Sequence, residues 1–366
     1  MTQKMNKFNS LKKTTKVDFA TYLGVIVVFI ITTILQNNGS LKRSAIGLLV
    51  PICCYMSMAV SLNLTVGILG ELSLGHAGFM SVGAFSGIVV SQSLVGAIPN
   101  APVRLAISMV VGAIFAAIVG LLIGTPVLRL QGDYLAIVTL AFGEIVKNVM
   151  NACYLGLDSH GLHFSLKDAS SLNMDADGKV LINGAMGITG ISKASNFTLG
   201  IVLVVITLLV ILNLVNSRAG RAITAIRDNE IAARSVGIPI TKYKLMAFVT
   251  SAVFAGVAGV LYALNYSSLV AKKFDYNTSI LILVFVVLGG IGNLRGSVIA
   301  AAVLTVLPEM LRSMNDYRML IYAIVLIVVM IFNQSPEMIA LRKRLTARFH
   351  KVDKEGKPDK EKKGVA

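Results

Sequence analysis

Ionisable side chains inside apolar sequence are the first candidates for chemistry in this chain. Asp133, Glu144 and Lys147 lie in or beside one apolar run. A charge in such surroundings is costly and normally faces protein or water. Glu144 and Lys147 are three residues apart, so they can pair on one helix face. Both a structural ion pair and a contact with a charged substrate are open for these groups.

A second group of candidates consists of polar side chains in glycine-rich apolar sequence: Asn63, Ser73, His76 and Thr139. Glycine lets helices approach closely and also permits broken helices that line a cavity. We therefore expect this group, together with Asp133 and Glu144, to line the path of a transported molecule, with close packing as the alternative. No second His or Cys lies at helical spacing from His76, so no metal site is predicted.

The sequence contains no pattern that would support catalysis. The nucleotide-binding pattern GxxxxGK(S/T) is absent, and the nearest glycine-rich run, GGIGNLRG at 289–296, lacks the lysine. The apolar runs hold no paired Asp, no HExxH and no Ser/His arrangement. We expect no enzyme active site, no bound cofactor and no ATP hydrolysis by the chain itself.

Membrane-spanning helices are the elements that must position these side chains. Hydrophobic residues make up 55% of the 366 residues and charged residues only 14%. The apolar residues form blocks of about 20, the length that crosses a bilayer core. The sequence predicts an all-α integral membrane protein with about ten spans. They lie at about 19–35, 44–66, 74–92, 104–123, 134–151, 198–215, 245–265, 276–291, 294–312 and 318–333. The third, rich in Gly and Ser, is expected to be short or broken.

The charge distribution sets an orientation for these spans. With both termini in the cytoplasm, 23 of the 34 Lys and Arg residues fall on the cytoplasmic side. The net charge of +16 thus reflects basic segments that flank spans, and nucleic-acid binding is not expected. The predicted parts are a basic cytoplasmic N-terminus (1–18), a transmembrane domain (19–333) and a basic cytoplasmic tail (334–366). Within the domain, 152–197 is an external polar loop, either an ordered cap or flexible, and 216–244 is a cytoplasmic loop.

The cytoplasmic loop contains a short helix pattern at 228–236. Asp228 or Asn229 can cap it, and Gly237 ends it with Pro239 just beyond. A short amphipathic helix between two spans suits docking into a groove of a soluble partner. An ordinary helix at the membrane surface is the alternative.

Four segments resemble one family of transporters. The run EIAARSVG at 230–237 resembles the EAA-type coupling loop of importer permeases. Its surroundings, GRAITAIRDNEIAAR at 220–234, look like those of LivM-type permeases of branched-chain amino acid ABC transporters. Similar to other signatures of that family are NLTVGILGELSLGHAGF at 63–79, LRLQGDYLAIVTLAFGEIV at 128–146 and GGIGNLRGSV at 289–298. The order is that of the family, and the resemblance covers about 45–335.

The resemblance implies a type II (vitamin B12-type) importer permease in a bacterial inner or plasma membrane. Its implied partners are a second, LivH-like permease subunit, two ABC ATPase subunits that hydrolyse ATP, an external substrate-binding protein and membrane lipid. It also implies that one segment couples the permease to the ATPase, through Glu230, Ala232, Ala233 and Gly237. Gly237 would be the pivot.

Departures from the family pattern leave the substrate open. The family usually has Gln where Glu71 stands and Gly-Gly-Pro-Asn-Gly in the region of 183–188, and 157–182 resembles an insertion. Leucine, isoleucine and valine are the implied substrates. Other small amino acids, amides or urea are the alternative, because related permeases handle them. An ion-coupled secondary transporter is a further alternative, for which Asp133 and Glu144 would be the ion-binding groups.

Overall fold

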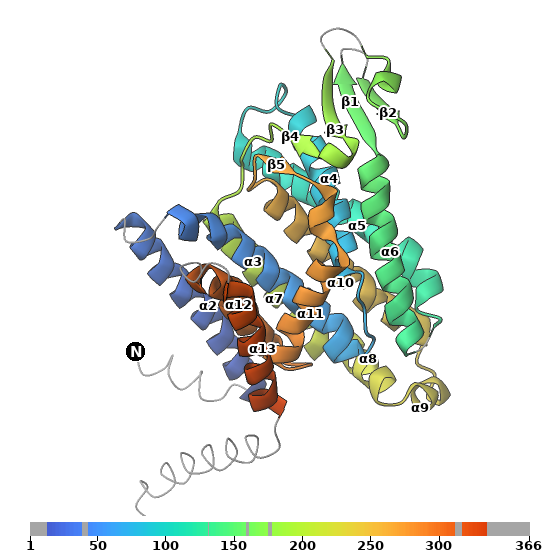
Figure 1. The fold of residues 1–366 in the computed structure, drawn as a ribbon. Helices are drawn as coiled ribbons and strands as arrows, with labels where there is room; N and C mark the ends of the chain where they lie inside the picture. The colour runs from blue at the N-terminus through green and yellow to red at the C-terminus, as the bar shows by residue number, and fades with distance from the viewer. Residues whose placement is uncertain are drawn as a thin grey trace, which may run out of the picture. The chain divides into compact units, whose positions relative to one another are not determined.

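The computed structural model describes residues 13–38, 43–130, 132–158, 161–174, 178–311 and 317–334. Residues 1–12 of the expected basic N-terminus and the tail after Gln334 therefore lie outside the described part. The chain divides into a unit of residues 1–306 and a unit of residues 307–366, which contains α13 (Arg318–Gln334). The other long helices are α2 (Lys13–Asn37), α3 (Arg43–Asn63), α4 (His76–Ser93), α5 (Ala101–Val127), α6 (Asp133–Ala152), α7 (Phe197–Asn216), α10 (Ile240–Ala263), α11 (Tyr276–Gly289) and α12 (Leu294–Met310) (Figure 1).

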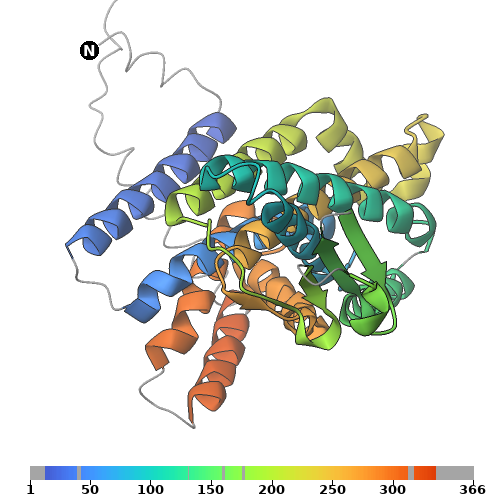
Figure 2. The same cartoon turned by 90° about the horizontal axis from the view of Figure 1, so that it is seen from above.

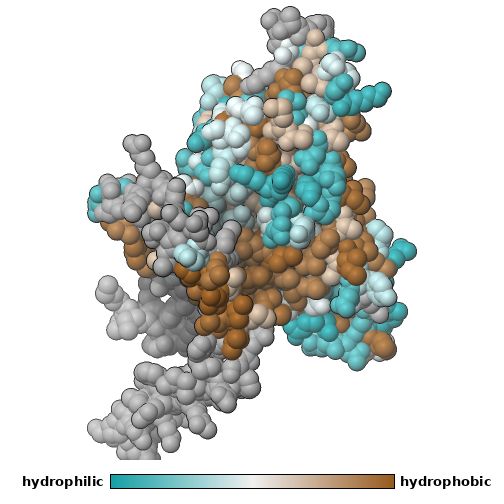
Figure 3. All heavy atoms as spheres, in the orientation of Figure 1, coloured by the Kyte–Doolittle hydropathy of each residue, from teal (hydrophilic) through white to brown (hydrophobic). Residues whose placement is uncertain are grey.

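Several of these helices could cross a membrane by length and composition. Five segments among the described residues meet both criteria: Ala45–Leu69, Ala101–Val127, Asp133–Ala152, Phe197–Asn216 and Ile240–Ala263. At about 1.5 Å per residue, each is long enough for a bilayer core of about 30 Å. Shorter apolar helices cover Gly24–Gln36 and Tyr276–Gly289. On the face that Figure 3 shows, hydrophobic residues gather between more polar regions, as expected for a surface that contacts lipid.

The centre of the first unit is α10, which packs against α3, α4 and α5. Glycines allow its backbone to contact that of α4. A Cβ atom on Gly83 would lie 2.1 Å from the Gly256 carbonyl oxygen, and one on Gly259 would lie 2.1 Å from that of Met80. Apolar burial drives helix association weakly in lipid, so close packing of small residues supplies much of the stability.

A helix break separates α3 from α4. The last turn of α3 continues into a π-helix, η1 (Leu64–Leu69), which ends at Gly70 with φ +83°. The chain is then non-helical until α4 begins at His76. The third span was expected to be short or broken. Its helix, α4, is instead continuous over 18 residues, and the interruption lies before it, at residues 70–75.

A small β-structure occupies the region for which a loop at 152–197 was expected. Strands β1 (Tyr154–Asp158), β2 (Gly161–Ser165) and β3 (Lys179–Asn183) form an antiparallel sheet in the order β2-β1-β3. The pair β4 (Ile188–Thr189) and β5 (Ser268–Leu269) connects this region to the segment after α10. Seen from above, the strands lie in front of the helices (Figure 2). The described part of this region is therefore ordered, and its external position stays a prediction. The expectation of an all-α chain applies to the long helices only, because hydropathy reports spans and misses short strands between them.

Two short helices, α8 (Arg218–Asp228) and α9 (Glu230–Ser235), lie between α7 and α10. They are at the end of the first unit opposite to the strands (Figure 1). The expected helix at 228–236 is confirmed as α9. The preceding α8 was not predicted from the sequence.

The contact between α4 and α10 can be tested at Gly83. Gly83→Ala should destabilise the chain by about 1–3 kcal/mol, because the added methyl group meets a backbone oxygen that cannot move independently. Thermal unfolding in detergent, followed with a thiol-reactive dye at the buried cysteines, would report a lower Tm. The matched control is Gly24→Ala in α2, where no heavy atom lies within 4 Å of the new Cβ. Equal Tm values for the two variants would contradict the close approach.

Candidate functional site

Side-chain caps fix where α8 and α9 begin. The Ser217 hydroxyl accepts a hydrogen bond from the Gly220 amide at 3.2 Å, and Asn229 Oδ1 accepts one from the Ala232 amide at 2.9 Å. Such caps satisfy amides that have no partner within the helix. Asn229, rather than the alternative Asp228, is therefore the cap of α9. Asp228 is instead the last residue of α8.

The end of α9 requires a glycine. Gly237 has φ +82°, a left-handed conformation that costs other residues energy. Its amide donates to the Arg234 carbonyl at 3.0 Å, and the Ile238 amide donates to the Ala233 carbonyl at 3.1 Å. These bonds satisfy carbonyls at the helix end and turn the chain toward α10.

One side of α9 is anchored and the other is exposed. Ala233 is buried with Ile226 and Ile240 in a small apolar cluster. By contrast, Ile231 is 82% exposed and Val236 is 76% exposed. An anchored helix that presents two apolar side chains to solvent can dock onto another molecule with little loss of conformational entropy.

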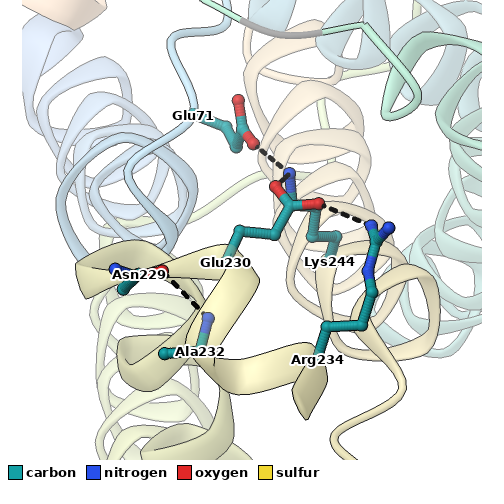
Figure 4. A network of polar contacts seen from close by, with 6 residues as sticks. All are labelled: Glu71, Asn229, Glu230, Ala232, Arg234 and Lys244. Atoms are coloured by element: carbon teal, nitrogen blue, oxygen red, sulfur yellow. Dashed lines mark hydrogen bonds and ion pairs between the residues drawn. The ribbon is translucent and has the colours of Figure 1, made fainter.

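An ion-pair network connects α9 to α10 and to the helix break. Lys244 Nζ lies 2.6 Å from Glu71 Oε1 and 3.0 Å from Glu230 Oε2, and Arg234 Nη2 lies 3.1 Å from Glu230 Oε1 (Figure 4). The Lys244 side chain is only 5% exposed. Two cations and two carboxylates make the group neutral. Since Lys244 is buried, removing one partner would leave a charge poorly compensated.

Arg227 provides a second connection from α8 to the same break. Its Nη1 donates to the Gly67 carbonyl in η1 at 3.1 Å, while Nη2 pairs with Asp228 at 2.8 Å. A Cβ atom on Gly70 would lie 2.6 Å from Arg227 Cγ, so the arginine stem packs directly on the Gly70 backbone. The segment of α8 and α9 therefore contacts both η1 and the residues that follow it.

A pocket of about 720 Å³ lies beside these contacts. Residues 69–72, residues 226–231 and the side chains of Arg234 and Lys244 line it, together with Gly132 and Asp133 at the start of α6. Among the predicted residues, the pocket brings together Asp133 and Glu230 only.

The polar residues expected along a pathway are buried around the helix break, and most have hydrogen-bond partners there. Asn63 Oδ1 accepts from the Gly292 amide at 2.8 Å, and its Nδ2 donates to Ser297 Oγ at 2.8 Å. Thr139 Oγ1 accepts from the Leu74 amide at 3.0 Å. These bonds explain the positions of Asn63 and Thr139 structurally. A role in transport stays a prediction for both.

Ser73 and His76 differ in their surroundings. His76 Nε2 lies 2.9 Å from Ser61 Oγ, which joins the start of α4 to α3. The Ser73 hydroxyl is buried and has no hydrogen-bond partner in the described part of the chain. Their role in transport is likewise still a prediction.

The ionisable groups of α6 are separated. Glu144 pairs with Lys147 on one helix face, which is the structural pair that the spacing allowed, and Glu144 also accepts from the Tyr276 amide at 3.1 Å. Asp133 is the exposed first residue of α6. Since Asp133 and Glu144 are 11 positions apart in the helix, they lie about 16 Å apart along the axis. Within the described residues, no group of three or more His, Cys, Asp or Glu side chains could hold a metal ion, and the three cysteines are free and buried.

Sequence reasoning did not identify Lys244 and Arg227 as members of this site. A lysine one turn inside an apolar helix was the available signal for Lys244, because such a charge needs a partner. The identity of that partner, Glu71, depends on a contact across 173 residues and has no local signature.

The cap of α9 can be tested at Asn229. Asn229→Ala should weaken α9 by about 1 kcal/mol, because the Ala232 amide loses its acceptor. Hydrogen–deuterium exchange of residues 230–235 should become faster. Asn196→Ala is the matched control, because Asn196 occupies the same position before α7 without a side-chain bond. Unchanged exchange in Asn229→Ala would contradict the capping role.

Comparisons with known proteins identify a family of transport permeases. The family model described as branched-chain amino acid transport system permease component matches residues 44–330. The high-affinity branched-chain amino acid transport system permease protein LivM of Salmonella typhimurium is 31% identical over 85% of this chain and 72% of its own length. That of Escherichia coli K12 is 33% identical over 76% of this chain and 66% of its own length.

A more distant relative has a different name. The fructose import permease protein FruG of Bifidobacterium longum is 25% identical over 83% of this chain and 87% of its own length. No solved structure matches the chain significantly. The match to the family model covers most of the chain, and both LivM proteins exceed 30% identity. This chain belongs to the family of branched-chain amino acid transport system permease components.

Proposed function

We propose that this chain is the membrane-spanning permease subunit of an ATP-driven importer of branched-chain amino acids. The observation that carries the proposal is α9, an anchored helix with an exposed apolar face at one end of a bundle whose sequence belongs to this permease family. Its relatives are named as transport permeases, and the chain acts as a transport subunit rather than an enzyme.

The docking surface for the ATPase subunits is proposed to be α9, with Glu230, Ala232, Ala233 and Gly237. Ala233 holds the helix to the bundle, and Ile231 and Val236 extend from it. The left-handed turn at Gly237 is where the direction of α9 can change relative to α10. ATP is hydrolysed by the partner subunits, since the sequence has no phosphate-binding pattern.

The proposed topology has ten spans, with both termini in the cytoplasm, in the type II arrangement. Two features support it. A helix occupies each of the ten predicted ranges, and the strands and the α8–α9 segment lie at opposite ends of the first unit. The cap of β1–β3 then faces the external binding protein, and α9 faces the ATPase. A second, LivH-like permease subunit would complete the pathway.

Branched-chain amino acids are proposed as substrates because both LivM relatives are named for that transport. The similarity to a fructose import permease makes a sugar the second candidate. An ion-coupled mechanism has less support, because Glu144 is paired with Lys147 and Asp133 lies at the other end of α6.

Transport assays test the proposed function directly. The chain would be co-expressed with the second permease subunit, the ATPase subunits and the binding protein, and then reconstituted into liposomes. ATP-dependent uptake of labelled leucine, reduced by excess isoleucine and unaffected by excess fructose, is expected. Uptake that needs a proton or sodium gradient instead of ATP would show a secondary transporter.

The docking role of α9 can be tested at Ile231. Ile231→Asp should weaken binding of the ATPase subunits by about 1.5–3 kcal/mol, because an apolar contact is replaced by a charge. Co-purification of the ATPase measures this loss, and the exposed position of Ile231 should leave folding intact. Leu162→Asp, at an exposed position on β2 in the cap, is the matched control and should not affect co-purification. Equal retention of the ATPase by both variants would place the docking surface elsewhere.

A further inference from the structure

Lys244 lies between two segments that are far apart in the sequence. We propose that Lys244 is a positioning residue that ties α9 to the helix break at residues 70–75, so that movement of α9 displaces the break and η1. This inference rests on the proposed function, in which α9 receives the motion of the ATPase.

The geometry makes Lys244 the connecting group. Its ammonium contacts Glu71 at 2.6 Å and Glu230 at 3.0 Å, so one cation joins the break to the first residue of α9 (Figure 4). The Glu71 side chain is 14% exposed and the Lys244 side chain is 5% exposed. Ion pairs at exposed sites are weak because water screens them, whereas a largely buried pair resists separation.

Glu230 has a second partner, Arg234, which also lies on α9. This pair holds the Glu230 carboxylate to its own helix, so the carboxylate moves together with α9. Lys244 contacts that carboxylate and Glu71 at the same time, and the motion of α9 therefore reaches the break.

Contacts beyond Glu71 extend the link into the bundle. Arg227 holds the Gly67 carbonyl, and a Cβ atom on Gly67 would lie 2.3 Å from the Gly292 amide nitrogen. Asn63 Oδ1 accepts a hydrogen bond from that same amide. A shift of residues 67–71 therefore acts on the turn at 290–293, between α11 and α12. The displaced element is a π-helix, a form that is rare and is frequently found at functional sites.

The test measures leucine imported per ATP hydrolysed by the full transporter in liposomes. Lys244→Met should lower this ratio by about fivefold or more, the usual range of coupling between sites. Co-purification of the ATPase should be unchanged, since Ile231 and Val236 stay in place. The matched control is Lys242→Met, an exposed lysine on the same helix that should leave the ratio unchanged.

Variants at Glu71 keep the test decisive if Lys244→Met does not fold. Glu71→Ala should lower the ratio as Lys244→Met does, because the acceptor on the break is lost. Glu71→Gln should keep most of the unaltered chain's ratio of leucine imported per ATP, because the amide oxygen still accepts a hydrogen bond from Lys244. The double variant with Ala at 71 and Met at 244 should be no worse than either single variant.

Specific outcomes would overturn the inference. A wild-type ratio in Lys244→Met or Glu71→Ala would show that the link transmits nothing. Additive losses in the double variant would show that the two residues act separately. If the unaltered chain imports leucine with ATP while these outcomes occur, only this inference fails. If the unaltered chain does not assemble with an ATPase, the proposed function fails with it.

Discussion

Backbone groups released at a helix break inside an apolar bundle need hydrogen-bond partners, because lipid offers none. At the interruption between α3 and α4, side chains of the neighbouring helices supply these partners. The Leu74 amide is satisfied by Thr139 of α6, and the Ala77 amide by Ser279 of α11 at 3.0 Å. The Gly67 carbonyl is satisfied by Arg227 of α8. Helices from distant parts of the sequence are thus joined at one place by the same requirement.

This requirement also changes how the buried polar residues are understood. Asn63 and Thr139 were expected along the transport pathway, because polar groups in apolar helices often mark transport routes. Their bonds to the Gly292 and Leu74 amides show what they contribute to the fold. A residue that holds a break in place can still affect transport, because the break can move when the hydrogen bonds of that residue open. Structure and function are not exclusive explanations here.

Most of the helical framework could be predicted from the sequence. The expected span at 134–151 corresponds to α6 (Asp133–Ala152), and that at 198–215 to α7 (Phe197–Asn216), because long apolar runs have no other stable form in lipid. Shorter elements were harder to predict from the sequence. The helix α8 is polar on one side and short, and β1–β3 lie in a polar region where hydropathy gives no signal. At the site, local patterns predicted that α9 ends at Gly237 and limited its cap to Asp228 or Asn229; the structure shows that the cap is Asn229. The contact of Lys244 with Glu71 could not be predicted from local patterns, because it depends on tertiary packing.

The arrangement of charges around Lys244 constrains the order in which its members can change during evolution. Glu71 can drift to a neutral amide, since Lys244 would keep Glu230 as its counter-ion. Losing Lys244 first is less favourable, because it would leave the Glu71 and Glu230 carboxylates near each other without the cation that contacts both. Substitutions at these positions should therefore accumulate in one direction along a lineage, with Glu71 changing before the lysine. Among relatives, the position of Lys244 should then vary little, and the position of Glu71 should vary more.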